Sequence, residues 1–66
     1  MDQFEQLREN IRLLSWQIKE IALYDSHNEI IGWLIDGIRC REGLKCTAGT
    51  LLQALQKFLE SVGGEK

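Results

Sequence analysis

SHNEIIGWLIDGIRCREG, residues 26–43, is the stretch that decides between a helical and a mixed fold. Its first four residues, SHNE at 26–29, have the form of a capping box, in which a serine and a glutamate three residues later satisfy the first turn of a helix. The isoleucines and the leucine that follow fall on one helical face. Gly43 stands where a glycine commonly ends a helix. This stretch therefore predicts a helix over about residues 27–42.

The same stretch also fits a β-hairpin. Residues 30–35 are rich in β-branched side chains, and Asp36-Gly37 is a favourable hairpin turn. Gly32 and Gly37 would each cost a helix up to about 1 kcal/mol. Against the hairpin, Glu42 breaks the alternation of its second arm, and an isolated hairpin is only marginally stable. We expect the helix, and the alternative is an α+β fold with a central hairpin at Asp36-Gly37.

The residues before this stretch predict a long first helix, from about residue 3 to residue 24. Asp2 is its expected N-cap, and Glu5 three residues later makes an aspartate version of the capping box. Apolar residues recur at alternating spacings of 3 and 4, which is the pattern of a paired helix. They are Phe4, Leu7, Ile11, Leu14, Ile18 and Ile21.

The residues after this stretch predict an amphipathic third helix, beginning at Thr47 or Thr50 and ending at Gly63-Gly64. The connections between the three helices are short, so consecutive helices should fold back on each other. The expected fold is all-α, a compact three-helix arrangement in one domain over residues 1–66, with a homodimer as the favoured state. The apolar arc of the third helix comprises Leu51, Leu52, Leu55, Phe58, Leu59 and Val62.

The first two helices carry more apolar surface than three short helices can cover. Leu13, Trp16 and Leu23 form a second stripe on the first helix, with Tyr24 at its edge, and Trp33 widens the arc of the second helix. Such a surplus indicates deep burial, self-association or partner binding. We expect these five residues to bind a partner or a second copy. The expected basic rim of that surface comprises Arg39, Arg41 and Lys45.

Composition excludes several classes of protein. The formal net charge of −2 argues against a general nucleic-acid binder. No apolar run approaches the roughly 20 residues that span a bilayer, and the acidic start, MDQFE, does not resemble a signal peptide. Two cysteines are too few for a disulfide scaffold. We therefore expect a cytoplasmic protein that does not bind membranes.

The chain offers little for catalysis or metal binding. Cys40 and Cys46 are its only thiols and His27 its only imidazole, and their spacing matches no common zinc site. No nucleophile, metalloprotease or phosphate-loop motif occurs. We expect no enzyme activity, cofactor, metal or small-molecule substrate. The cysteines should be reduced and packed near the core, with a redox-sensitive disulfide between them as the alternative.

These observations favour a small, non-enzymatic protein–protein interaction module: an adaptor, antagonist or regulator that covers a surface of a larger protein. The alternative is a dimeric DNA-binding transcriptional regulator that uses the second and third helices as a helix-turn-helix. The scarcity of positive charge argues against this alternative. The third helix carries only Lys57, and DNA affinity depends mainly on phosphate neutralisation.

Overall fold

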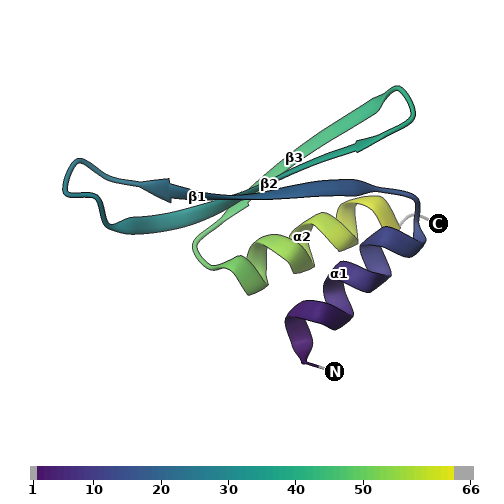
Figure 1. Cartoon of the computed structure of the whole chain (residues 1–66), viewed down its shortest axis with the longest axis horizontal. Coiled ribbons are helices and arrows are strands. Elements are labelled where there is room, and N and C mark those ends of the chain that lie inside the picture. Colours follow the sequence, from purple (N-terminus) through teal and green to yellow (C-terminus); the bar gives the residue numbers. More distant parts are fainter. Residues whose placement is uncertain (1, 64–66) are drawn as a thin grey trace.

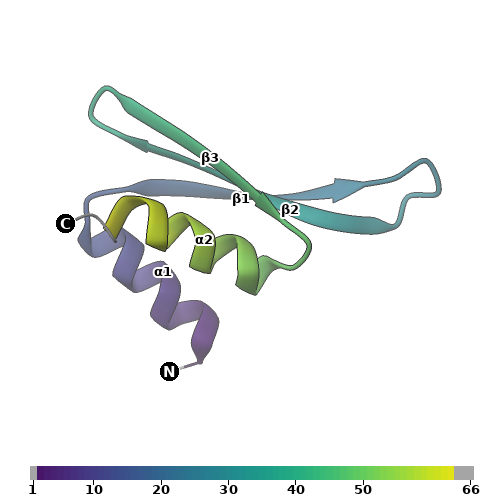
Figure 2. The ribbon, with the colours of Figure 1, turned by 180° about the vertical axis from the view of Figure 1, so that it is seen from behind.

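A computed structural model of the chain describes residues 2–63. The elements are α1 (Gln3–Leu13), β1 (Gln17–Tyr24), β2 (Ile30–Arg39), β3 (Glu42–Ala48) and α2 (Leu51–Gly63). The strands form one antiparallel sheet in the order β1-β2-β3. Both helices lie on one side of this sheet, as Figure 1 and the view from behind in Figure 2 show. The fold is α+β, so the expected all-α, three-helix arrangement is wrong.

The first helix begins where the sequence predicts but is much shorter. The Asp2 carboxylate accepts a hydrogen bond from the Glu5 N–H at 2.8 Å, which confirms the predicted N-cap. The helix closes at Leu14, and Ser15 then adopts a left-handed conformation with φ 71° that redirects the chain. Ile18, expected on the same helical seam as Leu14, lies in β1 instead.

Residues 26–43 form a turn and two strands instead of the expected second helix. β2 is the central strand: Ile35 lies opposite Glu20 of β1 and opposite Cys46 of β3. β-Branched residues suit a strand that is paired on both sides, and β2 contains four isoleucines. The mixed alternative therefore had the correct fold class. Its hairpin position was wrong, because Asp36-Gly37 lies within β2 and the chain turns at residues 25–29 and 40–41.

Gly37 lies inside a strand because an aromatic ring occupies the space of a side chain there. A Cβ atom at this position would collide with the ring of Phe58 from α2. Glycine within a strand often marks such a close approach. The contact lets α2 lie directly against the middle of β2.

The core lies between the sheet and the helices, with α2 packed on β2 and β3 and α1 packed on α2. The Trp16 ring meets the Phe58 ring edge-on, with centroids 5.4 Å apart and planes at 88°. Trp16 is only 6% exposed, so its expected place on an exposed stripe is wrong. The buried apolar residues are Ile11, Trp16, Ile35, Ala54, Leu55 and Phe58.

Helix α2 confirms the predicted third helix. Its N-cap is Thr50, whose hydroxyl accepts a hydrogen bond from the Gln53 N–H at 3.2 Å. Thr47, the other candidate start, lies in β3. The helix extends to Gly63, in agreement with the predicted end, and Gly64 lies outside the described residues.

The molecule is thin and extended for its length. Its dimensions are 40 × 30 × 18 Å and its radius of gyration is 12.1 Å, against about 10.8 Å for a compact chain of 66 residues. Figure 1 shows the reason: the β1–β2 hairpin and the β2–β3 hairpin extend beyond the helices in different directions.

The β2–β3 turn holds a side chain in an unfavourable conformation. Arg39 pairs with Glu42, so Cys40 and Arg41 are the two central residues of a tight hairpin. Cys40 has φ 54°, in the left-handed region, while Arg41 does not. A positive φ at the first central residue alone is the pattern of a type II′ turn, which prefers glycine there.

We expect Gly37→Ala to lower the free energy of unfolding by about 1–3 kcal/mol, because the added methyl group overpacks the contact with Phe58. Urea unfolding followed by circular dichroism measures this. Gly43→Ala in β3 is the matched control, since a Cβ there meets only the Gly37 carbonyl oxygen, at 3.9 Å. Equal losses for the two variants would contradict this account of the fold.

We expect Cys40→Gly to raise the free energy of unfolding by about 1 kcal/mol, because glycine adopts the left-handed region without strain. Cys40→Ala removes the same thiol and keeps the strain, so it controls for loss of the sulfur. A glycine variant no more stable than the alanine variant in urea unfolding would show that the turn is unstrained.

Candidate protein-binding surface

Exposed large apolar side chains gather on the β1–β2 hairpin. Of the seven in the described residues, five lie in β1 or β2, and the other two, Phe4 and Leu13, lie on α1. Scattered exposed apolar residues are ordinary, whereas a group of them on one element indicates a binding surface. The five on the hairpin are Ile21, Tyr24, Ile30, Ile31 and Ile38.

Three of these residues form what we call the tip patch: Tyr24, Ile30 and Ile31, which are 59%, 51% and 59% exposed. Tyr24 lies opposite Ile30, at the end of the hairpin that projects past the helices (Figure 1). The strand register shifts between Leu23 and Tyr24, which leaves Ile31 without a partner residue on β1. The tip patch is thus an apolar surface at the far end of the molecule.

The turn beside the tip patch is ordered by hydrogen bonds that converge on Asp25. Its carboxylate accepts from the backbone N–H groups of His27, at 2.8 Å, and Glu29, at 3.0 Å. Its own N–H donates to the Glu29 carbonyl at 3.0 Å, and its carbonyl accepts from the Asn28 N–H at 3.1 Å. Asn28, with φ 62°, occupies the left-handed position that asparagine tolerates. The tip patch therefore lies beside a turn that hydrogen bonds already order.

The side of the sheet away from the helices, here called the open face, combines apolar and charged rows. Ile35 and Gly37 face the helices, so alternation turns Leu34, Asp36 and Ile38 to the other side. The strand register then places their neighbours on β1 and β3. One row across the strands is Lys19–Asp36–Lys45, and the next is Ile21–Leu34–Thr47.

The structure separates the residues that the sequence analysis grouped as one interface. Tyr24 lies in the tip patch and its neighbour Leu23 on the half-buried open face. Trp33 packs against the core from the helix side, Trp16 is buried in the core, and Leu13 is exposed on α1. The grouping assumed the 3.6-residue period of a helix, whereas residues 17–24 and 30–39 follow the two-residue period of strands.

The three cations expected to form one rim lie in different surroundings. The Arg39 guanidinium sits over the Trp16 ring, 5.0 Å from its centroid, and donates to Glu42 at 2.8 Å. Arg39 therefore covers the core. Arg41 is exposed in the β2–β3 turn, and Lys45 lies on the open face.

The two thiols are free and lie in different surroundings. Cys40 is exposed, whereas Cys46 packs against the core as the sequence analysis expected for both. Cys40 lies in the turn before β3, which begins at Glu42. Cys46 lies four residues farther along β3 than Glu42, and four residues of extended strand span about 13 Å. A disulfide requires Cα atoms within about 7 Å, so this structure does not bring the two thiols together.

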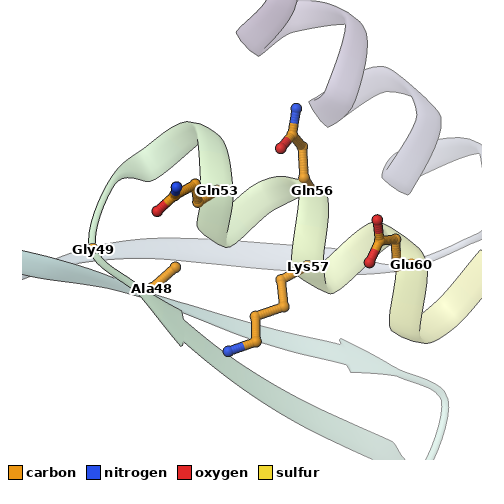
Figure 3. Close-up of a pocket in the computed structure, with 6 residues that line it drawn as sticks. All are labelled: Ala48, Gly49, Gln53, Gln56, Lys57 and Glu60. Atoms are coloured by element: carbon orange, nitrogen blue, oxygen red, sulfur yellow. The ribbon is translucent and has the colours of Figure 1, made fainter.

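No cluster of three or more His, Cys, Asp or Glu residues within residues 2–63 could hold a metal ion. Figure 3 shows a shallow hollow beside α2 whose labelled side chains point in different directions. Lys57, at its edge, donates to the Thr47 carbonyl at 3.0 Å. The hollow is lined by Ala48, Gly49, Gln53, Gln56, Lys57 and Glu60.

Two arginines of α1 are held in ion pairs. Arg8 donates from Nε and Nη2 to the Glu20 carboxylate of β1, at 2.6 and 2.9 Å, which ties α1 to the sheet. This hydrogen bonding raises the pKa of Arg8 above its ordinary value. Arg12 pairs with Glu9 on its own helix, which raises the pKa of Arg12 in the same way. Both cations are therefore already neutralised by carboxylates of the same chain.

The helix-turn-helix of the DNA-binding alternative is absent, because residues 30–48 form β2 and β3. The single cation of α2, Lys57, is engaged with the Thr47 carbonyl. No helix within residues 2–63 is long and apolar enough to cross a membrane.

No protein-family model, no curated protein and no solved structure matches this chain. The tip patch and the open face are the prominent features of the described surface.

We expect Asp25→Ala to loosen the tip without unfolding the protein, because it removes the acceptor of two backbone hydrogen bonds in an exposed turn. Amide exchange measured by NMR should become faster at His27 and Glu29, while exchange in β2 next to Phe58 stays slow. Ser26→Ala, in the same turn, is the control. Unchanged exchange at His27 and Glu29 would mean that Asp25 does not order the tip.

Proposed function

We propose that this protein is a non-enzymatic protein–protein interaction module that inserts the tip patch of its β1–β2 hairpin into an apolar pocket of a larger protein. The observation that carries the proposal is the exposure of Tyr24, Ile30 and Ile31 on an ordered turn that projects past the helices. A small domain gains nothing in its own stability from such a surface, whereas a binding protein requires one.

The residue types of the tip patch suit an interface anchor. Tyrosine is enriched at binding hot spots, where its ring is buried and its hydroxyl finds a polar partner. Burial of a large aliphatic side chain contributes about 1.5–3 kcal/mol when it is complete. Tyr24, Ile30 and Ile31 each retain more than half of their surface for this purpose. Because the turn is already ordered, little of that gain is lost in fixing the loop.

The charges beside the tip patch specify the rim of the partner's pocket. Asp25 and Glu29 flank the apolar residues, and the whole chain carries a net charge of −2. A pocket rimmed by lysine or arginine would complement them and speed association, with an affinity that falls as salt rises. The same charges disfavour phosphate backbones and anionic lipid surfaces. The partner is therefore a protein with a basic rim around an apolar pocket.

The proposed setting is the cytoplasm, where thiols stay reduced. Both cysteines are free, and the exposed Cys40 would be vulnerable to oxidation in a secreted protein. In that setting the protein would act by occupying its partner's pocket, as an adaptor or regulator.

We expect Ile31→Glu to weaken binding of the purified partner by at least tenfold, since it places a charge in the apolar pocket. The partner is first captured with the wild-type chain, then purified and titrated calorimetrically at low and high salt. Gln56→Glu adds the same charge on the exposed side of α2 and should bind like the wild type. Equal affinities for the wild type and Ile31→Glu would refute the proposed role of the tip patch.

A further inference from the structure

β1 is an edge strand whose outer side is unprotected. It is eight residues long and contains no proline. Its charged residues are Lys19 and Glu20, and its register shift lies near one end, between Leu23 and Tyr24. In the described residues, no side chain forms a hydrogen bond with a backbone group of β1. Its outward N–H and C=O groups are available to another strand.

The opposite edge of the sheet is protected. β3 carries one glutamate and one lysine, as β1 does, so charge does not distinguish the two edges. The Thr47 carbonyl of β3, however, accepts a hydrogen bond from Lys57 of α2. Covered backbone groups discourage strand addition. The two edges therefore differ, and β1 is the one at which the sheet can be extended.

We propose that β1 pairs with β1 of a second copy of this chain, in antiparallel orientation, with Ile21 opposite Ile21 of the second copy. In such a pair, a two-fold axis places one residue opposite its own copy. An axis at Lys19 or Glu20 would oppose like charges, which destabilises a strand pair. An axis at Ile21 avoids this and pairs all of β1 except Gln17.

The side chains of β1 are complementary in this register. On the open face, Ile21 meets its own copy and Lys19 lies opposite Leu23 of the second copy. On the helix side, Ile18 lies opposite Tyr24 of the second copy, and Glu20 lies opposite Ala22. No residue of like charge is paired, and Glu20 keeps its bond to Arg8. Pairing would cover apolar surface on Ile21, which is 39% exposed in one chain.

The pairing shares one residue with the proposed function: Tyr24, at the end of β1, lies opposite Ile18 of the second copy. Ile30 and Ile31 of the tip patch belong to β2 and remain free. Loss of partner binding in Ile31→Glu with an intact dimer, or the reverse, therefore identifies which of the two proposals fails.

The test is the mass of the particle in solution, measured by sedimentation. It compares the wild type with two variants that place opposite charges at the two-fold axis, Ile21→Lys and Ile21→Glu. The wild type should sediment at twice the chain mass of 7.6 kDa. Ile21→Lys and Ile21→Glu should each be monomeric, because like charges meet at the axis. An equal mixture of the two variants should again be dimeric. A monomeric wild type, a dimer in either single variant, or a mixture that stays monomeric would overturn the proposal.

Ile38→Lys separates strand pairing from stacking of two open faces. Ile38 lies on the open face of the central strand and is as exposed as the tip patch, so its substitution should not disturb folding. Pairing through β1 leaves it outside the interface, and the variant should remain dimeric. A monomeric Ile38→Lys would show that the faces stack and would refute edge pairing.

An intermolecular disulfide provides a second test if the charged variants fail to fold. Directly opposed residues of antiparallel strands have Cα atoms about 4.5–5.5 Å apart, within the range of a disulfide. Ile21→Cys in a Cys40→Ser, Cys46→Ser background should give a covalent dimer with oxidised glutathione. Ile38→Cys in the same background should not. Equal yields from the two positions would contradict the pairing.

Discussion

The contact between the ring of Phe58 and the bare backbone of Gly37 is the interaction on which the rest of this fold depends. It brings α2 against the central strand, and Trp16 then packs edge-on to the same ring. Arg39 covers Trp16 from outside, and α1 packs on α2. With only six buried apolar residues in the described chain, each of these steps relies on the previous one. A small protein of this kind has no second core to compensate for a loss.

This small core also explains where the apolar surplus goes. Both helices cover the same side of the sheet, so the other side and the projecting ends of the two hairpins receive no cover from the described chain. Most of the exposed apolar side chains lie in β1 and β2, on the hairpin whose turn is ordered by Asp25. An exposed apolar hairpin end adds nothing to the stability of a single chain, and its ordered turn supports the proposed binding role.

The sequence predicts the helices better than the strands, because helix signals are local. The Asp2 cap and the one-sided arc that follows Thr50 lie within single segments, and the structure has both. The pairing of Ile35 with Glu20 and Cys46 joins distant segments, and no local pattern reveals it. The serine-to-glutamate box at 26–29 was misleading, since Asp25 orders that segment as a turn. Gly32 and Gly37 were the correct warning against a helix.

The same limit applies to the candidate surface. Tyr24 and Leu23 were singled out from the sequence, whereas Ile30 and Ile31 were assigned to one face of a helix and missed.

The hydrogen bond from Lys57 to the Thr47 carbonyl has a consequence for assembly. It covers a backbone group at the β3 edge, which leaves β1 as the edge for the proposed pairing. In the proposed dimer both β1 edges are filled, so the paired sheet would have a fixed size, without the open-ended stacking that leads to fibrils.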